Sequence, residues 1–113
     1  MHEMSLAEGI VQIVETTARA NDARAVRAVW LALGALSHVE HESLRFSFDV
    51  VKHGTVAHDA RLEIEITPGR AWCMPCAESV DLARLGDACP RCGSHQLQVT
   101  QGEEMRVKEI EIA

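Results

Sequence analysis

Two short cysteine turns constrain this chain more than any other feature of its sequence. Cys73 and Cys76 form one C-x-x-C turn, Cys89 and Cys92 form a second, and twelve residues separate the two turns. Together they supply four thiolates, which is the number of ligands that a tetrahedral Zn²⁺ ion requires. Because four thiolates leave no open position for water or substrate, the spacing predicts a zinc ion that stabilises the fold and performs no hydrolysis.

The cysteines fit three rival roles less well. A rubredoxin-type iron site uses the same four ligands, so the sequence alone separates it poorly from zinc. A thioredoxin-like redox site has one such turn at the start of a helix in a βαβ setting, and neither turn has that setting. Zinc ribbons in nucleic-acid proteins have basic surfaces, whereas the spacer here holds Glu78, Asp81 and Asp87 against Arg84.

The size and charge of the chain narrow its function further. Its 113 residues suffice for one domain with a small satellite. The net charge of -6 argues against nucleic acid or an anionic membrane as the main partner. The sequence has neither a signal-peptide pattern nor the roughly 20 apolar residues of a membrane helix. We therefore expect a cytoplasmic protein, in which reduced thiols favour metal binding over disulfides.

Hydrophobic periodicity predicts two helices and three strands outside the cysteine segment. The helices are expected over residues 5–19 and 42–52, and the strands over residues 25–33, 61–66 and 104–112. Ser5 is the expected N-cap of the first helix, with Glu8 as its capping-box partner. Gly34 is expected to end the first strand, and Gly54 lies where the second helix needs a C-terminal cap.

The order of these elements predicts an α+β fold. Two helices would lie on a three-stranded sheet, and a small zinc-ribbon-like domain would be inserted before the last strand. We expect residues 1–69 and 101–113 to form the first domain and residues 70–100 the zinc-binding domain.

The amino terminus is a second candidate metal site. The α-amine of Met1, the amide nitrogen and imidazole of His2, and the amide nitrogen of Glu3 lie close enough in the chain to chelate one ion. Planar nitrogen donors of this kind suit Ni(II) or Cu(II). Taken alone, however, a histidine at position 2 is more often an accident of an exposed terminus.

The remaining histidines have ordinary interpretations. His38, His41, His53 and His58 fall near predicted loops and helix ends, where solvated histidines are common. His95 follows the second cysteine turn, and a surface position is favoured over a hydrogen bond to a zinc ligand.

Several motifs, which together extend over essentially the whole chain, resemble those of the HypA/HybF family of nickel metallochaperones for [NiFe]-hydrogenase maturation. They are Met1-His2-Glu3-Met4-Ser5-Leu6, Gly34-Ala35-Leu36-Ser37-His38-Val39-Glu40, Glu42-Ser43-Leu44-Arg45-Phe46, the two cysteine turns, and Thr100-Gln101-Gly102-Glu103-Glu104-Met105-Arg106-Val107. His41 stands where many relatives have proline, and the spacer between the cysteine turns contains no histidine.

The resemblance implies a nickel-binding α/β domain and a zinc domain inserted before the final strand. It implies that Met1, His2 and Glu3 bind Ni(II), with an accessory role for Glu40. It also implies that Cys73, Cys76, Cys89 and Cys92 bind zinc. The implied partners are the GTPase HypB and the precursor of the hydrogenase large subunit.

Competing functional classes make different predictions. A zinc-ribbon adaptor that binds only protein would not need Met1, His2 or Glu3, and a rubredoxin-like electron carrier would be red and hold iron. An enzyme is the least favoured class, because no nucleophile and base have a recognisable spacing. The carboxylate pairs Glu63/Glu65 and Glu109/Glu111 are better explained as solvated faces of strands.

Overall fold

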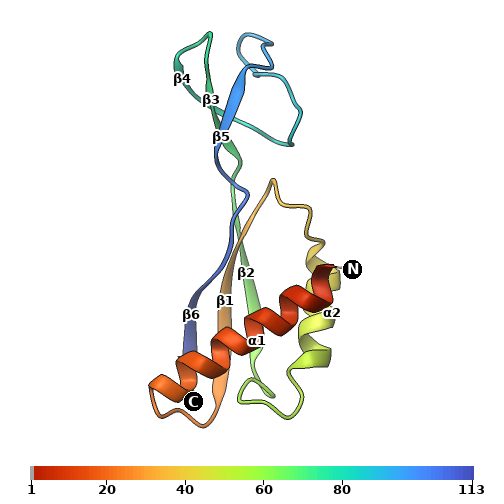
Figure 1. The fold of residues 1–113 in the computed structure, drawn as a ribbon, viewed down its shortest axis with the longest axis vertical. Helices are drawn as coiled ribbons and strands as arrows, with labels where there is room; N and C mark the ends of the chain where they lie inside the picture. Colours follow the sequence, from red (N-terminus) through yellow and green to blue (C-terminus); the bar gives the residue numbers. More distant parts are fainter. Residues whose placement is uncertain (1) are drawn as a thin grey trace. The chain divides into compact units, whose positions relative to one another are not determined.

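Two helices and two three-stranded sheets make up the structure, a computed structural model that describes residues 2–113, with side chains from residue 3 onward. The elements, labelled in Figure 1, are α1 (His2–Ala20), β1 (Val26–Gly34), α2 (His41–Val51), β2 (Arg61–Thr67), β3 (Arg70–Cys73), β4 (Glu78–Asp81), β5 (Leu97–Gln101) and β6 (Met105–Ile112). The strand order is β2-β1-β6 in one sheet and β4-β3-β5 in the other. The expected α+β class is confirmed.

The chain divides into two compact units. The first contains the chain up to Leu31, together with Val39–Ile64 and Val107–Ala113. The second contains Ala32–His38 and Glu65–Arg106. Each unit has its own buried residues and is described separately.

Both helices belong to the first unit and pack against each other. Their apolar stripes are buried, as the periodicity predicted: α1 buries Ala7, Ile10, Val11, Val14 and Ala18, and α2 buries Leu44 and Phe48. In contrast, Phe46 is 67% exposed, so this residue beside the stripe of α2 points away from the core. In the same unit, β1 buries Val26, Val29 and Leu31, and β2 buries Leu62, so helices and strands both contribute buried apolar side chains.

The expected cap of α1 was wrong. The helix already begins at His2, so Ser5 lies inside its first turns and is no N-cap. The cap of α2 was missed altogether. Glu40 fills this position, and its Oε1 atom accepts hydrogen bonds from the backbone N–H groups of Glu42 (2.8 Å) and Ser43 (3.1 Å). Glutamate is not among the residues that usually cap helices, so composition gave no signal here.

The second unit contains a sheet where periodicity predicted no regular element. β3 pairs with β4 and with β5, both antiparallel. One face of this sheet forms a core in which Leu36, Ala71 and Leu82 pack with the partly buried Leu97 and Val99. These strands have only four or five residues, too few for alternation to stand out in the sequence.

Backbones cross closely in the second unit, where no side chain would fit. A Cβ atom added to Gly34 would lie 1.9 Å from the carbonyl oxygen of Gly102. Gly102 itself has a φ of +109°, and a Cβ there would lie 2.7 Å from the Cα of Gly69. The approach allows two backbone hydrogen bonds, from Gly34 N to Glu104 O (2.7 Å) and from Leu36 N to Gly102 O (2.8 Å). Glycine is therefore required at this crossing.

Among the described residues, no helix has the length and apolar character needed to cross a membrane.

Replacing Gly34 by alanine should destabilise the protein by about 1–3 kcal/mol, because the new methyl group must push two backbones apart. Gly9→Ala in α1 is the matched control, since a Cβ there meets nothing within 4 Å. That control should be neutral or gain about 0.5–1 kcal/mol from helix propensity. Urea unfolding followed by circular dichroism measures both changes. Equal stability of the two variants would contradict the close approach at Gly34.

Candidate metal centre

The first cysteine turn lies at the tip of the β3–β4 hairpin. Cys73 ends β3, and Ala77, with a φ of +52°, reverses the chain before β4. Two backbone hydrogen bonds stabilise the turn. Met74 N donates to Gln96 O (3.0 Å), and Ala77 N donates to Met74 O (3.3 Å). The hairpin thus fixes the direction of the Cys73 and Cys76 side chains.

The second turn is held by its own backbone. Gly93 N donates to Cys89 O (2.9 Å), and Cys89 N donates to Ser94 O (2.7 Å). Gly93 has a φ of +78°, which explains why glycine follows the second cysteine pair. Arg91 N also donates to the Sγ atom of Cys89 (3.4 Å), a contact that favours a thiolate at this position.

The two turns bring all four sulfur atoms together. Every Sγ of Cys73, Cys76, Cys89 and Cys92 lies within 4.8 Å of the other three. The Cys73–Cys92 separation is 3.6 Å and the Cys76–Cys89 separation is 4.0 Å, and all four cysteines are free. A tetrahedron of sulfurs at about 2.3 Å from a central ion has edges of about 3.8 Å. The sulfurs therefore already have nearly the spacing that one metal ion imposes.

The thiols affect one another's protonation. Burial raises the pKa of Cys73, and contacts with the sulfurs of Cys92 and Cys73 raise the pKa of Cys76 to about 12. Burial by itself would raise the pKa of Cys89, but the N–H groups of Cys92 and Arg91 and the sulfurs of Cys73 and Cys92 together lower it to about 7. Four crowded thiols cannot all ionise without added positive charge. A bound cation would supply that charge and hold all four as thiolates.

The cysteines are also part of the local core. Cys73, Val80 and Cys89 are buried together, and Cys76 and Leu97 pack against them. This cluster contains few large apolar side chains. A core of this size gives little stability by itself, so a metal ion would contribute strongly to the folding of this segment.

Two residues of the second candidate site lie side by side in the first unit. The backbone N–H of Glu40 donates to Oε2 of Glu3 across 3.3 Å, which joins the start of α2 to the start of α1. Both cap bonds of α2 end on Oε1 of Glu40, so the cap does not occupy Oε2. The Glu3 side chain thus contacts the backbone of Glu40, the residue whose own carboxylate caps α2. Met1 and the side chain of His2 lie outside the described residues.

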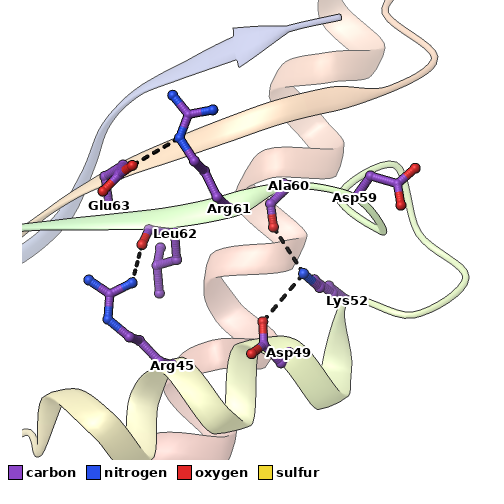
Figure 2. A pocket seen from close by; sticks show the side chains of 8 residues that line it. All are labelled: Arg45, Asp49, Lys52, Asp59, Ala60, Arg61, Leu62 and Glu63. Atoms are coloured by element: carbon purple, nitrogen blue, oxygen red, sulfur yellow. Dashed lines mark hydrogen bonds and ion pairs between the residues drawn. The ribbon is translucent and has the colours of Figure 1, made fainter.

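A pocket of about 380 Å³ in the first unit has no catalytic arrangement (Figure 2). Each of its three cationic side chains has a partner in or beside α2 or β2. Arg45 donates to Leu62 O, Lys52 donates to Ala60 O and pairs with Asp49, and Arg61 pairs with Glu63. With three acids balancing three cations, the pocket offers no surplus of charge for an anionic ligand.

Comparison with known proteins gives one consistent result. The family model described as "Hydrogenase/urease nickel incorporation, metallochaperone, hypA" matches residues 1–112. The hydrogenase maturation factor HypA of Azotobacter vinelandii is 60% identical over 112 residues, which cover 99% of each chain. The HypA of Rhodopseudomonas palustris strain BisA53 is 56% identical over the same share.

Solved structures agree with this result. The solution structure of the nickel metallochaperone HypA from Helicobacter pylori has a TM-score of 0.71 at 25% identity, covering 97% of this chain and 96% of that one. A second HypA solution structure has a TM-score of 0.75 at 26% identity, covering 100% and 97%. The chain therefore belongs to the HypA family of metallochaperones, maturation factors for nickel incorporation rather than catalytic enzymes.

Proposed function

We propose that this protein binds Ni(II) at its amino terminus and delivers it during [NiFe]-hydrogenase maturation, while zinc bound by four cysteines holds the second unit together. The observation that carries the proposal is the convergence of four sulfur atoms within 4.8 Å, in a chain that matches the HypA family over residues 1–112. The thiolate set and its near-tetrahedral spacing favour zinc for the structural role.

The nickel site would use nitrogen donors of Met1 and His2 and the amide or carboxylate of Glu3. The hydrogen bond between Glu40 N and Glu3 Oε2 supports an accessory role for Glu40, because it places the backbone of Glu40 beside a proposed nickel-binding residue. Imidazole binds metal in its neutral form, so nickel affinity should fall as the pH decreases and imidazole becomes protonated. Such a site releases its ion when a partner offers further ligands.

The partners in this proposal are the GTPase HypB and the precursor of the hydrogenase large subunit, in the cytoplasm. Zinc-bound cysteines and nickel carried as cargo require no catalytic residue in this chain. A zinc-ribbon adaptor without nickel function is the alternative. It shares the cysteine site but gives no role to the amino terminus, so nickel binding separates the two hypotheses.

Cys76→Ser should remove the bound zinc and unfold the second unit, because one missing thiolate leaves the ion with an incomplete tetrahedron. Elemental analysis should give one zinc and no iron per chain for the wild type. Fluorescence of Trp72 in a Trp30→Phe background reports on the second unit. Met74→Ala is the matched control in the same turn, since this side chain is 56% exposed. If Cys76→Ser retained zinc and the wild-type Trp72 signal, the four-cysteine site would be wrong.

Nickel binding should depend on the amino terminus itself. We expect the zinc-loaded protein with a native terminus to bind Ni(II) tightly in calorimetry. His2→Ala should lose this event, and so should a variant with Gly-Ser placed before Met1, which moves the α-amine but retains the imidazole. His95→Ala, an exposed histidine of the second unit, is the control. Tight binding that survives both N-terminal changes would contradict a nickel site at the amino terminus. No nickel binding by the wild type would leave the adaptor hypothesis.

Two substitutions separate the capping role of Glu40 from its proposed role with nickel. Glu40→Ala should cost about 1 kcal/mol of stability, because two N–H groups of α2 lose their acceptor. Glu40→Gln keeps an oxygen for the cap but removes the charge, so it should weaken nickel binding with little change in urea unfolding. Unchanged nickel affinity in Glu40→Gln would confine this residue to the cap.

A further inference from the structure

Two exposed histidines are held side by side in the loop that joins α2 to β2. The ring centroids of His53 and His58 are 5.2 Å apart, with an angle of 76° between the ring planes. Both residues belong to the first unit, and both are exposed. The sequence suggested separate solvated histidines, and their spacing of five residues matches no periodic element that would place them together.

The loop between them is well ordered by its own hydrogen bonds. Thr55 N and Thr55 Oγ1 both donate to Lys52 O, at 3.1 and 2.6 Å. The N–H of Ala57 donates to Thr55 Oγ1 (3.0 Å), and the N–H of His58 donates to Thr55 O (3.1 Å). One further bond, from Val26 N to Val56 O (2.9 Å), ties the loop to β1. The two imidazoles are therefore brought together by the fold before any ligand arrives, which reduces the entropy lost on binding.

The hydrogen bonds of the rings determine which nitrogens are available. Nδ1 of His53 lies 3.1 Å from Val50 O, and because a carbonyl only accepts, this nitrogen must carry the proton. The lone pair is then on Nε2, the arrangement that metal-binding histidines commonly use. Nδ1 of His58 accepts a long bond of 3.4 Å from Gly54 N. Shifting the proton of His58 to Nδ1 would break only this weak bond, at an exposed position where water can replace it.

The separation of the rings fits a shared ion. When two imidazoles bind one ion through Nε2 at about 2.1 Å, each ring centroid lies about 3.2 Å from the ion. The two centroids then lie roughly 4.5 Å apart if the N–metal–N angle is that of a square-planar site, and roughly 5.3 Å apart if it is tetrahedral. The observed 5.2 Å falls within this range. Late first-row divalent ions are the ions that imidazole binds well, and Ni(II) is among them.

We propose that His53 and His58 form a second site for a late first-row divalent ion such as Ni(II), separate from the nitrogen donors of the amino terminus. Two protein ligands leave the remaining positions to water, so the site is weaker than a chelate with four ligands and exchanges its ion quickly. It would give the first unit a second place to hold the same cargo.

The test uses the full-length, zinc-loaded protein with Gly-Ser placed before Met1, so that the amino-terminal chelate is absent. Calorimetry with Ni(II) should show one binding event. His53→Ala and His58→Ala should each weaken it by on the order of 100-fold, because the second imidazole acts through its high effective concentration. The double variant should lose the event, because neither imidazole of the pair remains. His95→Ala is again the control, and circular dichroism verifies the fold.

Paramagnetic Ni(II) should also broaden the backbone amide signals of residues 53–58 first. Binding unchanged in both single variants, or broadening confined to other residues, would overturn the proposal and leave the pair as a ring contact that stabilises the loop. The outcome is independent of the amino-terminal site. The amino-terminal site is tested by whether the Gly-Ser extension removes tight nickel binding. The histidine pair is tested by whether His53→Ala and His58→Ala weaken the nickel binding that remains in the extended protein.

Discussion

The convergence of four sulfur atoms is the constraint on which the second unit depends. Two turns meet there, and the strand between them, β4, has four residues. Without a cation, the crowding of the sulfurs opposes ionisation, as the raised pKa of Cys76 indicates. A divalent cation in the centre would attract all four thiolates and so offset their mutual repulsion. Metal binding and the folding of this unit are therefore expected to be one event rather than two.

The glycine crossing complements this centre. Where Gly34, Gly69 and Gly102 approach one another, backbone groups bond directly and leave no room for side chains. The buried side chains of the second unit then fill the space between this crossing and the cysteines. A small core bounded by a metal site and by backbone contacts needs few large apolar residues, which explains how the second unit folds with modest burial.

Residue patterns predicted the two helices and the four-cysteine site, and the physical reasons can be identified. Helical periodicity extends over many residues in α1 and α2, and the cysteine spacing reflects the geometry of one ion, so both were visible in the sequence. The cap at Glu40 could not be predicted, because glutamate is an unusual N-cap residue and its φ and ψ depend on the loop before α2. The contact between Glu3 and Glu40, and the pairing of His53 with His58, arise from tertiary packing and loop hydrogen bonds that no local pattern encodes.

The start of α1 at His2 bears on the proton balance of the proposed nickel site. The first four N–H groups of an α-helix have no partner inside the helix. A metal ion could therefore displace the protons of the amide nitrogens of residues 2 and 3 into solvent without breaking any hydrogen bond of the helix. The negative charge so created would lie at the positive end of the helix dipole, which favours it. Beginning a helix at this point thus lowers the cost of using the backbone itself as a ligand.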